Sequence, residues 1–204
     1  MTSVRTRHHC IITGTGRAGT TLLVLLLAKL GFDCGYRPDE LVIDPVAHAG
    51  LEKDIRSDDA PYIVKSPWIC TYVTELMARS DIVIDCAFVP IRSLSEAAES
   101  RRSVQRQRAT SEPVYGGLWR VDRPEDQETE LATLFYGLIH ELNRKDVPVV
   151  FLDFPRFALD ANYLYNKLSS ALAVPPRAEF HVAFSQVVKQ ELISDFSTEN
   201  RAAK

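Results

Sequence analysis

Near its start the chain gathers glycine, threonine and arginine residues in a pattern suited to binding an anion. Residues 10–31 read CIITGTGRAGTTLLVLLLAKLG. An apolar run enters a turn with three glycines, and two hydroxyl residues follow: Gly14, Gly16, Gly19, Thr20 and Thr21. Glycine lets backbone N–H groups turn toward a phosphate, and a helix amino end adds partial positive charge. The pattern therefore predicts a phosphorylated ligand.

The turn departs from the Walker loop of nucleotide hydrolases, GxxxxGK followed by Ser or Thr. Gly14 and Gly19 keep the glycine spacing, but Thr20 stands where the Walker lysine would be. The nearby cation is instead Arg17, inside the loop. The order Arg17-Ala18-Gly19-Thr20-Thr21 resembles the 5′-phosphosulfate loop of the sulfotransferase family, which has a basic residue, a small residue, glycine and two hydroxyl residues. The resemblance implies that residues 14–21 bind the donor 3′-phosphoadenosine 5′-phosphosulfate, with Gly16 in the turn.

A second anion site is predicted after the strand expected at Ile82–Val89. Arg92 follows this strand, at the edge where open α/β sheets bind ligands. Ser100 comes eight positions later, about two turns along the helix that we expect here. The pair resembles the 3′-phosphate site of sulfotransferases, in which an arginine fork and a serine hydroxyl would hold the phosphate. Arg101, Arg102, Arg106 and Arg108 follow, and we expect most of them on a solvated helix face, with one able to reach the donor.

Lys65 ends the next predicted strand, Tyr62–Lys65. Many sulfotransferases carry a lysine in this place, which implies that Lys65 faces the transferring group together with Arg17. Ser66 and Pro67 follow it, so the histidine base of the aryl-type members has no counterpart here. Several branches use a glutamate shortly after the first helix, and this implies Glu40 as the catalytic base, with Asp39 as second choice.

The implied reaction is in-line transfer of a sulfuryl group to a hydroxyl or amine acceptor, which leaves adenosine 3′,5′-bisphosphate. Positioning and charge stabilisation would supply most of the rate, and we expect no metal. The acceptor would be a small molecule or a glycan. Two alternatives stay open: a P-loop kinase using Mg-ATP, and a non-catalytic nucleotide-binding protein. Asp85 in an apolar strand favours the kinase, whereas its mid-strand position and the missing Walker lysine oppose it.

These residues must be positioned by alternating strands and helices, which predict an α/β fold. We expect a three-layer sandwich around a mainly parallel sheet, in one domain over residues 1–204, and the resemblance implies a P-loop NTPase-like fold. The expected strands are His9–Thr13, Tyr62–Lys65, Ile82–Val89 and Val147–Asp153. The expected helices are Thr20–Leu30, Pro45–Arg56, Trp68–Arg79, a segment capped by Ser93 or Ser95, Glu128–Lys145, Asp160–Leu172 and Val182–Phe196, with a loop at Thr110–Asp126.

Composition narrows the class of protein further. The chain has 204 residues and a formal net charge of −3, which disfavours a nucleic-acid partner. The apolar run in residues 22–30 is too short for a membrane span, and residues 1–9 do not resemble a secretory signal. Cys10, Cys34, Cys70 and Cys86 lack CxxC spacing, which indicates buried, reduced thiols and a cytoplasmic protein. The sequence does not predict the oligomeric state.

Overall fold

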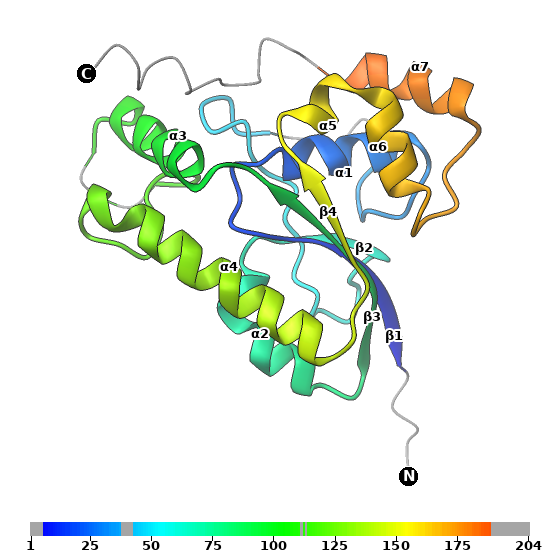
Figure 1. Cartoon of the computed structure of the whole chain (residues 1–204), viewed down its shortest axis with the longest axis horizontal. Coiled ribbons are helices and arrows are strands. Elements are labelled where there is room, and N and C mark those ends of the chain that lie inside the picture. The colour runs from blue at the N-terminus through cyan, green and yellow to red at the C-terminus, as the bar shows by residue number, and fades with distance from the viewer. Residues whose placement is uncertain (1–5, 38–42, 111, 113, 189–204) are drawn as a thin grey trace.

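A four-stranded parallel sheet forms the centre of the molecule (Figure 1). The computed structural model describes residues 6–37, 43–110, 112 and 114–188. The strands are β1 (Arg7–Ile12), β2 (Ile63–Lys65), β3 (Ile82–Ile91) and β4 (Val149–Asp153), in the order β2-β1-β3-β4. The four predicted strands and the parallel α/β architecture are confirmed, with shifts of a few residues at the strand ends.

Helices cover both faces of this sheet, because successive residues of a buried strand point to opposite sides. Cys10 and Ile12 of β1 pack on one face, and Ile11 between them packs on the other. One face carries α1 (Thr20–Lys29), α5 (Arg156–Leu159), α6 (Ala161–Leu168) and α7 (Arg177–Val187). The opposite face carries α2 (Ile69–Ala78) and α4 (Gln127–Arg144), and α3 (Leu94–Gln107) packs against α4. The predicted layers are therefore present, and Figure 1 shows the two groups of helices on either side of the strands.

The helix predicted at Pro45–Arg56 is wrong, because the described residues 43–56 form turns and irregular backbone. The carboxylate Oδ1 of Asp44 accepts hydrogen bonds from the backbone N–H groups of Val46 and Ala47 at 2.9 and 2.7 Å. Such a local bond offers the backbone an alternative to the helical ladder. Leu51 also has a φ of 68°, which no right-handed helix contains. Leu51 and Ile55 of this irregular segment are nevertheless buried, one in each of the two hydrophobic cores.

Other helix ends differ from the prediction by several residues. α6 ends at Leu168 rather than at residue 172, and α7 begins at Arg177 rather than at residue 182. The predicted extension of that last helix beyond residue 188 lies outside the described residues. Asp160 caps α6, because its side chain accepts a hydrogen bond from the N–H of Tyr163. The short helix α5 was not predicted.

The order of the strands places a crevice at the end of β1. From β1 the chain passes to β2 on one side, and then crosses to β3 on the other side of β1. Open parallel sheets bind ligands outside the carboxyl ends of the strands, where the order of the strands reverses in this way. The glycine turn, residues 13–19, leaves β1 at this point. The topology thus brings the segment with the clearest anion-binding pattern to the expected binding edge.

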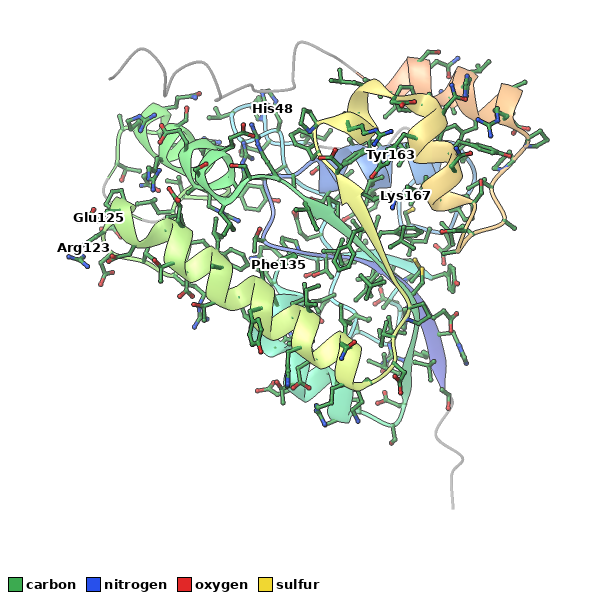
Figure 2. The ribbon with its side chains drawn as sticks, in the orientation of Figure 1. His48, Arg123, Glu125, Phe135, Tyr163 and Lys167 are labelled. Carbon is green, nitrogen blue, oxygen red and sulfur yellow. The ribbon has the colours of Figure 1, made fainter. Side chains whose placement is uncertain are left out.

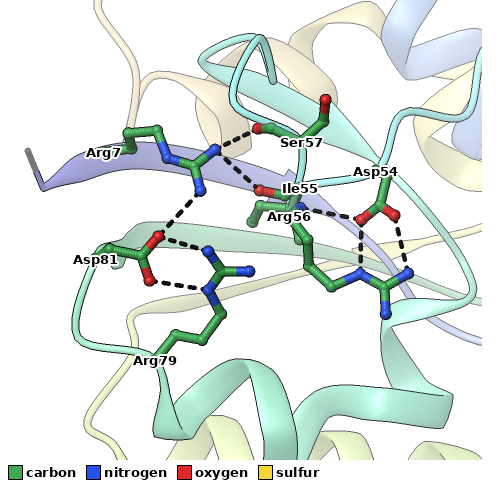
Figure 3. Close-up of polar contacts among 7 residues, drawn as sticks. All are labelled: Arg7, Asp54, Ile55, Arg56, Ser57, Arg79 and Asp81. Carbon is green, nitrogen blue, oxygen red and sulfur yellow. Dashed lines mark hydrogen bonds and ion pairs between the residues drawn. The ribbon is translucent and has the colours of Figure 1, made fainter.

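The amino end of the sheet is held by a network of arginines and aspartates (Figure 3). Asp81 accepts hydrogen bonds from Arg79 at 2.8 and 2.5 Å and from Arg7 at 3.2 Å. Arg7 also donates a hydrogen bond to the backbone carbonyl of Ser57, and this bond connects the start of β1 to the loop that precedes β2. The bonds from Arg79 above all, and also from Arg7, hold the pKa of Asp81 well below its usual range.

Among the described helices α4 is the longest, with 18 residues. None of the helices in residues 6–37, 43–110, 112 and 114–188 combines the length and apolar character needed to cross a bilayer.

Candidate functional site

A cavity of about 400 Å³ opens at the carboxyl edge of the sheet. Its wall is formed by the glycine turn, the start of α1, the ends of β2 and β3, α3 and the loops at 43–52 and 114–119. Most of the predicted site residues lie along it: Gly16, Arg17, Gly19, Thr20, Thr21, Lys65, Arg92 and Ser100. Gly14 and Ala18 do not line the cavity. Gly14 lies against the backbone of Pro90, and Ala18 is buried.

The amino end of α1 is built to leave its first turn accessible. Gly19 is the N-cap residue, with φ 75°, so no side chain caps the helix, and no acidic residue lies in the first turn. A Cβ at Gly19 would lie 2.7 Å from the ring of Phe157 and 2.9 Å from that of Phe154. Both the left-handed backbone and the packing therefore require glycine. The first N–H groups of a helix have no partner within the helix, so this end suits an anion.

Arg17 connects the glycine turn to α3 and to the loop at 43–52. Its Nε donates to Oγ of Ser100 at 2.9 Å, and its Nη1 donates to the carbonyl of Ala47. Burial, and next the charge of Arg92, lower the pKa of Arg17 to about 10, so it stays charged at neutral pH. The side chains predicted for the 5′- and 3′-phosphate sites thus touch each other directly.

Arg92 lies on the same side of the sheet as Arg17, as a single nucleotide bound by both would require. Its Nη1 donates to the carbonyl of Arg17 at 3.4 Å, and its Nε forms an ion pair with Glu96 at 3.0 Å. The guanidinium also lies over the ring of Phe154, 5.1 Å from the centroid. Residues 17 and 92 are far apart in the sequence, and the pairing of β1 with β3 brings them together.

Lys65 is almost completely buried, with 2% of its surface exposed. Its Nζ donates to the carbonyl of Gly50 at 2.6 Å and to Oγ1 of Thr21 at 3.3 Å, and it forms an ion pair with Glu52. Burial lowers the pKa of Lys65, while the carboxylate of Glu52 opposes this shift. The lysine therefore lies between the first turn of α1 and a carboxylate.

Glu52 was not predicted as a site residue, although it is an acidic residue on the cavity wall. One carboxylate oxygen pairs with Lys65, and the other accepts a hydrogen bond from the hydroxyl of Tyr115. Nothing in the sequence marks Glu52, because its position depends on a loop that was expected to be a helix. The predicted bases Asp39 and Glu40 lie outside the described residues.

Arg101 is the member of the arginine run that reaches the cavity. It is 6% exposed, and its two terminal nitrogens donate to the carbonyls of Thr15 at 2.6 Å and Gly117 at 3.0 Å. The guanidinium lies over the ring of Trp119 at 4.8 Å. Burial and the charge of Arg17 lower its pKa to about 9. Arg101 thus joins the glycine turn to the loop at 114–119 and adds charge to the site.

Positive charge exceeds negative charge around this cavity. Within the described part of the chain, four cationic side chains line the cavity: Arg17, Lys65, Arg92 and Arg101. Glu52 is the only carboxylate on the described wall. Lys65 and Arg92 each have a carboxylate partner. Arg17 and Arg101 donate only to carbonyls and to Ser100 among the described residues. A buried cation without a counter-charge is costly, so the arrangement favours an anionic ligand.

The residue that favoured a kinase lies elsewhere. Asp85 occupies a bulge in β3, and its carboxylate hydrogen-bonds to His8 at 2.8 Å and to Tyr62 at 3.2 Å. It does not line the cavity. His48 does line the cavity, whereas His140 stacks on Tyr136 along α4. Figure 2 shows His48 at the end of the sheet near α3. In the same view Tyr163 and Lys167, which do not line the cavity, lie together on α6.

No protein-family model matches this sequence, and no curated protein or solved structure is significantly similar to it. The function must therefore be inferred from the side chains of the cavity and their charges. Two features carry most of that information: the uncapped start of α1 and the excess of buried cations around it.

Proposed function

We propose that this protein is a sulfotransferase, with a P-loop NTPase-like fold, that uses 3′-phosphoadenosine 5′-phosphosulfate as donor. The observation that supports this is the convergence of separate motifs on one cavity. The glycine turn with Arg17, the strand-end Lys65 and the Arg92–Ser100 pair resemble sulfotransferase motifs in the same chain order, and all of them line it. Asp85, the residue that favoured a Mg-ATP kinase, does not line the cavity, so it no longer supports that alternative.

The donor's two phosphate groups fit the two neighbouring anion sites. Gly19, Thr20 and Thr21 hold the 5′-phosphate at the start of α1 through backbone N–H groups and hydroxyls. Arg92 and Ser100 hold the 3′-phosphate, and Arg17 lies between the two sites. Both phosphates are attached to one ribose, so a bisphosphorylated nucleotide needs anion sites that are close together. The direct contact between Arg17 and Ser100 supports this arrangement.

Transfer requires charge stabilisation at the leaving phosphate and a base for the acceptor. Arg17 and Lys65 stabilise the negative charge that grows on the 5′-phosphate oxygen as its bond to sulfur breaks. Glu52 takes the proton of the acceptor hydroxyl while the new bond from sulfur to oxygen forms. We place Glu52 in this role because it is the carboxylate beside Lys65 in the described cavity wall. The acceptor is a small molecule or a glycan that reaches Glu52 from the loops at 43–52 and 114–119.

Nucleotide-dependent stabilisation of the fold tests this proposal. Adenosine 3′,5′-bisphosphate at about 100 times its Kd should stabilise the protein by about 2.7 kcal/mol in a thermal unfolding measurement. Mg-ATP at the same concentration should have little effect. The Arg92→Met variant should require more nucleotide for the same shift, whereas Arg123→Met, an exposed arginine beyond the cavity, should behave like wild type. Stabilisation by Mg-ATP alone would support the kinase instead.

Turnover separates an enzyme from a nucleotide-binding protein. The protein is incubated with 3′-phosphoadenosine 5′-phosphosulfate and a panel of hydroxyl and amine acceptors, and the release of adenosine 3′,5′-bisphosphate is measured. Acceptor-dependent release is expected for at least one class of acceptor. Tight nucleotide binding without release across the panel would favour the non-catalytic reading.

A further inference from the structure

The hydroxyl of Tyr115 lies beside Glu52, the carboxylate that we propose as the base for the acceptor. Tyr115 belongs to the loop at 114–119 on the cavity wall, and its hydroxyl donates a hydrogen bond to one carboxylate oxygen of Glu52. The other oxygen of the same carboxylate is paired with Lys65. The phenol of Tyr115 and the ammonium of Lys65 therefore contact the same carboxylate, and we place Lys65 beside the transferring group.

Arg17 lies beside the loop that carries Tyr115. A Cβ at Gly116, the next residue, would lie 3.6 Å from Nη1 of Arg17. Burial and the neighbouring Glu52 raise the pKa of the Tyr115 phenol above its usual value. The phenol is thus protonated at neutral pH and needs a base to become a nucleophile. Glu52 is already hydrogen-bonded to it.

We propose that Tyr115 is a self-sulfation site, at which the protein transfers a sulfuryl group from the donor to its own phenol. This inference rests on the proposed function. The bond between sulfur and the 5′-phosphate oxygen breaks, and its electron pair stays on that phosphate oxygen. A new bond forms between sulfur and the phenol oxygen, and the phenol proton passes to Glu52. The products are tyrosine O-sulfate at position 115 and adenosine 3′,5′-bisphosphate.

Tyr115 is distinguished from the other tyrosines by its place in the structure. The chain has seven tyrosines, and Tyr115 is the only one of them on the described wall of this cavity. Tyr36 bonds to the backbone carbonyl of Glu52 rather than to its carboxylate, and Tyr136 is 74% exposed on α4. A nucleophile held beside its base reacts at a high effective concentration, so a built-in phenol competes well with a dissolved one.

The experiment follows modification of the full chain by its own donor. Purified protein is incubated with 3′-phosphoadenosine 5′-phosphosulfate and no acceptor, then digested, and the peptides are mapped by mass spectrometry under conditions that retain sulfate esters. One added sulfuryl group on Tyr115 is expected. The rate constant of labelling should not change with protein concentration, because the reaction is intramolecular. Adenosine 3′,5′-bisphosphate should appear in equal amount.

Three variants make the assignment specific. Tyr115→Phe should remove the label, and Tyr136→Phe, which changes an exposed tyrosine that does not line the cavity, should keep it. Glu52→Gln should slow labelling by about a hundredfold or more, because it removes the base. Stabilisation by adenosine 3′,5′-bisphosphate is measured for each variant, so that a loss of label can be separated from a loss of folding or of donor binding.

The possible results separate this inference from the proposed function. If the wild-type protein binds the nucleotide but Tyr115 stays unmodified, self-sulfation is overturned and the sulfotransferase proposal stands. Label on a different residue overturns it equally, as does labelling that speeds up with protein concentration. If the nucleotide does not bind at all, the proposed function and the inference both fail. First-order labelling at Tyr115 supports both.

Discussion

Arginines gather at both ends of the sheet, but their hydrogen-bond partners differ between the two ends. At the amino end, Asp81 accepts bonds from Arg7 and Arg79, and Asp54 accepts two from the side chain of Arg56 (Figure 3). At the carboxyl end, Arg17 and Arg101 bond to carbonyls and to one serine, with no carboxylate partner among the described residues. The arginines at the amino end are paired with carboxylates, whereas, in the part of the chain that the structure describes, the half-buried Arg17 and the buried Arg101 at the carboxyl end are not.

We interpret the amino-end network as support for the fold and the carboxyl-end arginines as part of the proposed anion site. An arginine paired with a carboxylate at the surface contributes modestly to stability and needs nothing more. A buried arginine without a counter-charge raises the free energy of the folded state until an anion binds. The same residue type thus indicates structure at one end and binding at the other. Three variants test this comparison, and we take them from the largest expected effect to the smallest.

Replacing Gly19 should have the largest effect on stability, because Gly19 belongs to the glycine turn that forms part of the cavity wall at the carboxyl end of the sheet. Gly19→Ala forces a Cβ into a left-handed backbone at φ 75° and against the ring of Phe157. We expect the free energy of unfolding to fall by about 2–3 kcal/mol in urea titrations. The control is Gly137→Ala in α4, where a Cβ meets nothing within 4 Å, and which should gain about 1 kcal/mol. Equal losses in both variants would mean that the turn is not specially constrained.

Replacing Arg17 should separate binding from stability. Arg17→Met removes a half-buried cation of the proposed site, so the affinity for adenosine 3′,5′-bisphosphate should fall by about 10- to 100-fold in calorimetric titrations. The unliganded variant should unfold at the same temperature as wild type or higher, because the uncompensated charge is gone. Arg123→Met, which removes an arginine that is 69% exposed, serves as control and should leave the affinity unchanged. A variant that loses stability while keeping its affinity would contradict the comparison.

Replacing Asp81 at the amino end should give the smallest effect and the opposite pattern. The folded state lowers the pKa of Asp81, so its stabilising contribution exists above the unfolded value of about 3.9 and disappears as the pH falls below it. The stability difference between wild type and Asp81→Asn should thus be constant from about pH 5 to 8 and shrink at lower pH. Urea unfolding at several pH values measures it, and nucleotide affinity should not change. A difference that grows on acidification would refute this assignment.

The sequence predicted the parts of the molecule that depend on local pattern. The four strands, the parallel α/β architecture and the helices α1, α2, α3 and α4 follow from apolar runs, helical spacing and caps. The segment 45–56 was predicted wrongly, because its helical spacing of apolar residues competes with an aspartate that bonds its own backbone. Ser93, in contrast, was expected as a cap and does accept a bond from the N–H of Glu96. Local hydrogen bonds decided both cases.

The candidate site shows the same division. Arg17, Lys65, Arg92 and Ser100 could be named from motifs, because each ends a strand, follows one or lies at a fixed spacing on a helix. Their assembly around one cavity depends on parallel strands that end at the same edge. Glu52 could not be named, since it arrives through an irregular loop whose path has no repeating signal. The sequence could not single out Arg101 among the four arginines of its basic run, because only its burial in the tertiary structure distinguishes it from the others.

By itself, then, the sequence determined the four strands, most of the helices and the glycine turn that we predict to bind an anion, since these arise from residues close together in the chain. The tertiary structure decided which charges meet. It paired Lys65 with Glu52, placed Tyr115 on the same carboxylate, and left Arg17 and Arg101 without a carboxylate among the described residues. Contacts between such distant residues depend on how helices and loops pack on the sheet, and no local pattern encodes that packing.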